Sequence, residues 1–197
     1  MDMTVRAVAM LICLLLVVTP IACAQSSAGR GDNDERPVGE RLENLAERLR
    51  LGLTVASVAA YSPTLADIRH HAQQLINMLE GAQGQHYVRP FQPLDEWPGI
   101  MPELVVISTR LDGQAFEPET RTQIAAAVNN TRTFLSLALE AALSGRDQRR
   151  LDLATLDMLR VYSYLAAAYE APCDTAYVPT LRTLVRILGA TGTDPSV

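Results

Sequence analysis

The residues best suited to metal chemistry lie on one predicted helix, which covers residues 64–81. Asp67 and His70 stand three positions apart, a spacing that places both side chains on one face of a helix. His71 follows at the edge of that face. Carboxylate and imidazole groups both bind first-row transition metals. One interpretation is therefore a transition-metal or haem site that uses Asp67, His70 and His71.

A structural role explains the same three residues. Di-iron bundles use Glu-x-x-His on each of two helices and a further Glu from two others, whereas this chain has one such motif, with Asp in place of Glu. Glu140 or Asp157 would have to supply the facing carboxylate. A solvated polar face, or hydrogen bonding between helices, needs no such partner. We therefore predict no bound cofactor, and we keep a transition metal or haem as the alternative.

Several other chemistries are excluded by residues and motifs that the chain lacks. All 17 basic residues are arginine, so neither a lysine Schiff base nor the lysine of a P-loop is present. The sequence contains no C-x-x-C-H, H-E-x-x-H, paired C-x-x-C or G-x-S-x-G motif. A net charge of -5 opposes a nucleic-acid partner, which requires a dense basic surface. These absences favour a protein that is not an enzyme.

The first 24 residues have the features of an export signal. A basic residue precedes an uncharged apolar run over residues 7–18, which is shorter than the roughly 20 residues that span a bilayer. Small residues near its end predict cleavage before Gln25. Lipidation at Cys23 is the alternative, because a lipoprotein signal also ends at a cysteine. Either outcome predicts an extracytoplasmic protein, periplasmic or secreted, that touches the membrane only through such a lipid anchor.

The rest of the chain divides into a linker, a helical domain and a short tail. Residues 25–38 are polar and rich in Ser, Gly and Asp, which predicts a disordered linker. Over residues 39–189 apolar residues recur at helical spacing between Pro and Gly breaks. Residues 190–197 are expected to fray. We predict an all-α fold, an up-down bundle of four to five helices plus a short helix over residues 100–111, for which a strand is the alternative.

Glycines and caps predict where these helices begin and end. Thr64 is expected to cap the helix that carries the histidines, and Gly81 to end it. A long helix starts at Pro118 and is expected to end at Gly145. Asp147 is then expected to open the following helix.

Two regions offer groups that could meet a ligand. The irregular stretch over residues 82–99 is the longest between predicted helices, and loops of that length often carry function. The alternative is a crossover that Phe91 and Trp97 pin to the core. Three tyrosines lie on the predicted helix after Asp147, with Tyr177 close behind it: Tyr162, Tyr164 and Tyr169. Their hydroxyls would line a cleft, or their rings would be buried with the hydroxyls reaching water.

The segment from His71 to Gly84 contains a short pattern. Gln74 stands in it where a second histidine is expected, which weakens a metal site built on a histidine pair. The matching positions are His71-Ala72, Asn77, Gly81 and the later Pro98-Gly99. In these positions the chain resembles uncharacterised exported bacterial all-helical proteins. The resemblance implies an exported helical fold and no activity.

The sequence therefore predicts an exported helical bundle that acts as a non-enzymatic binding or interaction module at the cell envelope. Its partner would be an unknown protein or a small ligand. The alternative function is a metal- or haem-binding bundle that uses the 64–81 helix.

Overall fold

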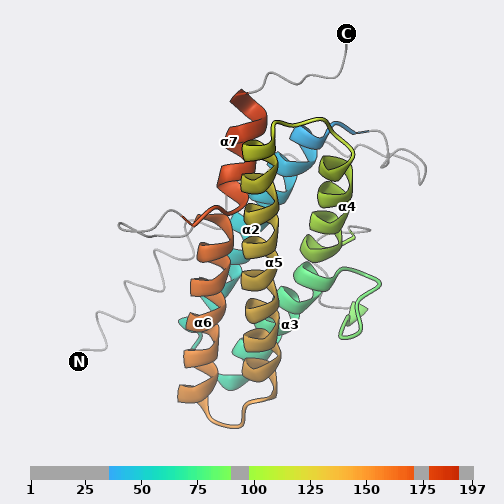
Figure 1. Ribbon diagram of the computed structural model, residues 1–197. Coiled ribbons are helices and arrows are strands. Elements are labelled where there is room, and N and C mark those ends of the chain that lie inside the picture. The colour runs from blue at the N-terminus through green and yellow to red at the C-terminus, as the bar shows by residue number, and fades with distance from the viewer. Residues whose placement is uncertain (1–35, 90–97, 171–177, 191–197) are drawn as a thin grey trace, which may run out of the picture. The chain divides into compact units, whose positions relative to one another are not determined.

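The computed structural model describes residues 36–89, 98–170 and 178–190, and in these ranges the chain is helical without a strand (Figure 1). The all-α bundle predicted from the sequence is confirmed, and residues 100–111 form a helix rather than a strand. The predicted leader, Cys23, Phe91 and Trp97 lie outside the described residues. The described helices are α2 (Val38–Ala60), α3 (Leu65–Glu80), α4 (Ile100–Asp112), α5 (Pro118–Asp147), α6 (Leu151–Tyr169) and α7 (Leu181–Ala190).

The helices pack around one apolar core. Figure 1 shows α5 and α6 side by side, joined at one end by residues 148–150. α2 packs against α6 and α3, α3 packs against α5, α4 lies along α2, and α7 contacts α2 and α5. Each fully buried Leu or Ile side chain contributes about 1.5–3 kcal/mol through loss of apolar surface from water. Among these core residues are Leu45, Leu49, Ile68, Leu75, Ile76, Leu104, Ile107 and Leu135.

The ends of α3 lie where the sequence predicts them. Thr64 has an extended backbone, and its Oγ1 accepts a hydrogen bond from the Asp67 amide over 3.1 Å. This bond satisfies one of the amides that a helix start leaves unpaired. Gly81 has a φ of 74°, a conformation that favours glycine. Local chemistry alone is therefore enough to set both ends of this helix.

The prediction that Gly145 ends its helix is wrong. α5 continues through it to Asp147, which is the last residue of that helix rather than the first of the next. α6 begins at Leu151. The physical reason is a close contact between helices, since a Cβ at position 145 would lie 2.4 Å from Met158 Cε. Gly145 lets α6 approach α5 and does not mark a stop.

A buried ion pair anchors α4 to the first turns of α2. Arg41 Nη1 donates to Glu103 Oε1 over 2.7 Å, and both side chains are buried. Breaking such a pair from one side typically costs about 3–5 kcal/mol, because it leaves an unpaired buried charge. The pair therefore holds in place the part of α2 from which Glu40 and Glu43 project.

Candidate functional site

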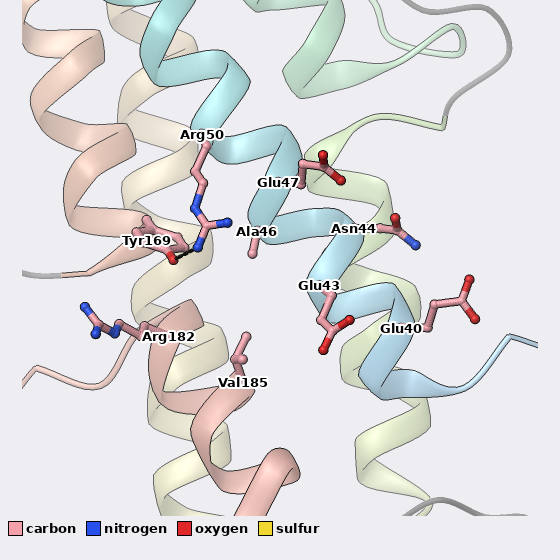
Figure 2. Close-up of a pocket in the computed structure, with 9 residues that line it drawn as sticks. All are labelled: Glu40, Glu43, Asn44, Ala46, Glu47, Arg50, Tyr169, Arg182 and Val185. Carbon is pink, nitrogen blue, oxygen red and sulfur yellow. Dashed lines mark hydrogen bonds between the residues drawn. The ribbon is translucent and has the colours of Figure 1, made fainter. Parts of the chain in front are cut away.

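An open groove lies where α2, the end of α6 and the start of α7 meet (Figure 2). Its volume is about 760 Å³, which is within the range of small-molecule sites. It is the candidate functional site, and the term groove refers to it below. The residues that line it are Glu40, Glu43, Asn44, Ala46, Glu47, Arg50, Tyr169, Arg182 and Val185.

Two arginines line one end of the groove, and each has a fixed partner. Figure 2 shows the Arg50 guanidinium beside Tyr169 and the Arg182 guanidinium turned away from α2. Arg50 Nη2 donates to the Tyr169 hydroxyl over 2.5 Å, and the guanidinium carbon lies 5.1 Å from the centre of that ring. This contact joins α2 to α6. Arg182 Nη1 donates to the carboxylate of Glu170, and that hydrogen bond raises the pKa of Arg182. Both cations are exposed and are held by one neighbour each.

Carboxylates lie on the α2 side of the groove. Glu40, Glu43 and Glu47 are all exposed and follow one another at helical spacing. Figure 2 shows Glu43 extending into the gap between α2 and α7, whereas Glu40 and Glu47 point away from α7. Ala46 is buried and Val185 is half-buried, so they supply an apolar floor. The groove therefore separates positive from negative charge across an apolar strip.

This lining supplies charge pairing rather than nucleophilic chemistry. The lining residues in the described ranges include no His, Cys, Ser or Thr. The one hydroxyl, on Tyr169, accepts the hydrogen bond from Arg50. A molecule with an anionic and a cationic end would meet a complementary group at each end of the groove.

The three predicted metal-binding residues lie close together on α3, but each forms a hydrogen bond with a nearby side chain. Asp67 accepts a hydrogen bond from the Thr64 hydroxyl over 2.6 Å and is exposed. Gln74 lies between the two histidines, with Nε2 at 3.1 Å from His70 Nε2 and Oε1 at 3.0 Å from His71 Nδ1. The two imidazole rings meet edge to face, 5.4 Å apart. The structure thus joins the histidines through an amide and ties the carboxylate to the helix start.

In the described residues neither Glu140 nor Asp157, the two carboxylates proposed to face this helix, forms a metal-binding group with these residues. Glu140 is exposed on α5. Asp157 is buried on α6 and accepts hydrogen bonds from Ser144 and Arg160, over 2.8 and 3.0 Å. Within the described ranges no group of three or more His, Cys, Asp and Glu residues could hold a metal ion. The metal or haem alternative stays a prediction, which stoichiometric metal or a Soret band in the purified protein would support.

The first half of the 82–99 loop folds against the C-terminal half of α3, in an arrangement we call the α3 clamp (Gln73, Asn77, Glu80 and residues 81–89). Asn77 Nδ2 donates to the Val88 carbonyl over 2.7 Å, and its Oδ1 accepts from the Val88 amide over 3.1 Å. Gln73 Nε2 donates to the carbonyl of His86 over 2.8 Å. Glu80 accepts from the amide of His86, also over 2.8 Å. In the clamp, side chains of α3 are therefore hydrogen-bonded to the backbone of the loop, and few of their donors and acceptors remain for a ligand.

Two glycines allow the clamp to close. Gly81 and Gly99 both have positive φ, and their backbones touch. A Cβ on Gly81 would lie 1.8 Å from the Pro98 carbonyl oxygen, and one on Gly99 would lie 2.5 Å from the Glu80 carbonyl carbon. Asn77, Gly81 and Gly99 belong to the pattern that carried the sequence resemblance. In this structure they hold a loop in place.

Sequence reasoning missed most of the groove. Of its lining residues only Tyr169 was weighed as a cleft residue, and it does line the groove. The signal in the sequence was weak, because Glu40, Glu43 and Glu47 at helical spacing also describe an ordinary solvated face. Arg182 comes more than one hundred positions later in the chain, so no local pattern joins it to them.

No family model, curated protein or solved structure matches this chain. In the described part of the chain no helix combines the length and the hydropathy that crossing a membrane requires. The groove geometry is therefore the main guide to function.

Proposed function

We propose that this protein is an exported, non-enzymatic binding module whose groove holds a small dipolar ligand. One observation carries the proposal, the separation of charge across the groove. Arg50 and Arg182 lie at one end, Glu43 extends into the gap from α2, and an apolar floor lies between them. Export rests on the predicted leader.

The guanidinium end suits a carboxylate. A guanidinium presents five N–H donors in a plane and binds carboxylates through paired hydrogen bonds. Tyr169 and Glu170 each engage one such group, which orients the cations and leaves donors for a ligand. Because these partners are already in place, little side-chain entropy is lost when a ligand carboxylate binds.

The opposite end suits an ammonium group. The Glu43 carboxylate accepts hydrogen bonds from such a group, and the half-buried Val185 contacts the alkyl chain that joins the two charges. Exposed charge pairs contribute about 0.2–1 kcal/mol each. Two such pairs and a half-buried alkyl contact amount to about 2–3 kcal/mol, so we expect weak binding, with a dissociation constant on the order of 10 mM.

Three probes with the same carbon chain test the proposal. They are 5-aminopentanoate, pentanoate and pentylammonium, titrated against the purified protein by NMR. We expect the dipolar probe to bind about fivefold more tightly than either singly charged probe, because only it meets both ends of the groove. Equal binding of pentylammonium would contradict the dipolar site, and so would no binding of any probe at about ten times the expected dissociation constant.

Single substitutions of charged residues test whether the dipolar probe binds in the groove. Glu43→Gln and Arg182→Gln should each weaken the dipolar probe about fivefold, while retaining the helical fold because both side chains are exposed. Glu140→Gln makes the same chemical change on the exposed face of α5 and should leave binding unchanged. If Glu140→Gln has the same effect as Glu43→Gln, binding does not occur in the groove.

A further inference from the structure

α6 exposes a row of large apolar side chains on the side turned away from the bundle. Their exposed fractions lie between 38% and 45%. They make up half of the large hydrophobic residues that are exposed in the described ranges. Concentrated apolar exposure of this kind marks an interaction surface. We call it the α6 outer face, and its apolar members are Leu151, Leu153, Leu156, Leu159 and Tyr162.

The centre of this face has coiled-coil spacing. Positions along it alternate in steps of three and four, which is the spacing of a helix seam. The middle of the seam is Leu156 and Leu159. The N-terminal half of the seam carries a charged residue and a leucine, and the C-terminal half ends in the small side chains of Ser163 and Ala166. In chain order the seam positions within α6 are Asp152, Leu156, Leu159, Ser163 and Ala166.

We infer that the α6 outer face binds a second copy of this chain, with the two α6 helices antiparallel about a twofold axis midway between Leu156 and Leu159. This arrangement places Leu156 beside Leu159 of the second copy, twice. It places Asp152 beside Ser163 of the second copy, whose hydroxyl would donate to the carboxylate in exchange for its present hydrogen bond to the Leu159 carbonyl. A twofold interface requires such self-complementarity, and here the large half of one helix meets the small half of the other.

The charges agree with this register. Asp152 is the one charged seam position within α6 and meets Ser163 of the second copy, so no like charges oppose one another along the seam. Asp152 accepts hydrogen bonds from Arg150, and Arg160 donates to Asp157 over 3.0 Å, so both flanking cations have a carboxylate in their own chain. A lipid surface fits less well, because the row contains a carboxylate at Asp152 and a hydroxyl at Ser163.

The size of the face predicts a weak dimer. α6 has 19 residues and is about 28 Å long. With the twofold axis between Leu156 and Leu159 only residues 151–164 of the two helices overlap, a length of about 21 Å. The contact therefore buries less than about 1,000 Å², in the range of transient interfaces. We expect a dissociation constant of about 10–200 µM. The face lies outside the groove lining, so groove variants should not change dimerisation.

Sedimentation equilibrium of the purified protein tests the inference, at concentrations from about one tenth to ten times that constant. Leu156→Glu and Leu159→Glu should each weaken the dimer at least about tenfold, because a carboxylate would be buried in the seam. Val105→Glu is the matched control, since Val105 is 52% exposed on α4, and it should leave the constant unchanged. A chain that stays monomeric throughout overturns the inference, and so does an equal effect of all three variants.

Cysteine pairing tests the register. Mixed Leu156→Cys and Leu159→Cys chains should form disulfide-linked dimers faster than either variant alone, with the unsubstituted chain as the reference. Faster linkage within each single variant would indicate a different register and contradict the antiparallel arrangement.

Discussion

The α3 clamp and the groove are both polar regions of one bundle, but their polar groups have different partners. In the clamp, side chains bind backbone, as when Asn77 holds both the amide and the carbonyl of Val88. In the groove, Glu43 extends into the gap, while Arg50 and Arg182 are each held by one neighbour. Gln73 and Asn77 of the clamp are buried and Glu80 is half-buried, whereas Glu43, Arg50 and Arg182 of the groove are exposed.

This difference shows how to tell a structural polar cluster from a binding site. A buried network with all its groups satisfied orders the chain and has little capacity left for a ligand. In a groove whose charged groups are held by few neighbours, hydrogen-bond donors and acceptors stay available for a ligand. Substitutions in the clamp should therefore change stability, and substitutions in the groove should change binding.

Gly81→Ala should lower the free energy of unfolding by about 3 kcal/mol or more. A Cβ would meet the Pro98 carbonyl oxygen, and the φ of 74° is itself unfavourable for alanine. Urea unfolding followed by circular dichroism measures the change. Gly39→Ala is the matched control on α2, where a Cβ meets nothing within 4 Å, and it should be neutral or stabilising by about 0.5 kcal/mol. A small effect at Gly81 would contradict the close backbone contact.

Asn77→Ala should cost about 2–3 kcal/mol of unfolding free energy, because it removes the side-chain partner of the Val88 amide and carbonyl and one of the two acceptors of Gln73 Nε2. Asn44→Ala makes the same change in the groove lining and should cost less than about 0.5 kcal/mol. Urea unfolding of the two variants compares the regions directly. If Asn44→Ala costs as much as Asn77→Ala, the groove is as much a part of the folding network as the clamp.

Glu80→Gln should cost about 1 kcal/mol, because Glu80 accepts hydrogen bonds from both the amide and the ring of His86. Glu43→Gln should leave stability within about 0.5 kcal/mol of the parent chain and should weaken the dipolar probe instead. Thermal unfolding and the NMR titration are run on both variants. Loss of probe binding in Glu80→Gln with full binding in Glu43→Gln would reverse the assignment of the two regions.

The smallest expected effect concerns pH. A hydrogen bond from Arg146 lowers the pKa of Asp147, and Arg146 also donates to Gln73 of the clamp. A lowered pKa in the folded state means that this carboxylate stabilises the fold above its ordinary pKa and loses that contribution as pH falls through the lowered value. Because the side chain is exposed and screened by solvent, Asp147→Asn should cost only about 0.5 kcal/mol at pH 7.

The Asp147→Asn difference should shrink between pH 7 and about pH 3, because the parent carboxylate becomes protonated as the pH falls through its lowered pKa. Urea unfolding of parent and variant at both pH values measures it. A difference of unchanged size at low pH would show that the substitution acts through packing rather than through charge.

Residues a few positions apart in the chain are enough to predict the helices and the signals at the ends of α3. Apolar residues at helical spacing predict the bundle, and Thr64 and Gly81 set the ends of α3 through bonds and dihedral angles within a few residues. Gly145 shows the limit of such reasoning. Its lack of a side chain indicates a stop when neighbours in sequence are considered, but the deciding contact is with Met158 on another helix.

Only the tertiary structure decided where the candidate sites lie. Arg50, Tyr169 and Arg182 come from three helices and meet because α2, α6 and α7 pack together. The leucines of α6 predict a helix equally well whichever face is buried. The positions of α2 and α5 determine that Leu165 is buried and Leu156 is exposed. Helix formation depends on residues a few positions apart, whereas a groove or an exposed face depends on which helices become neighbours.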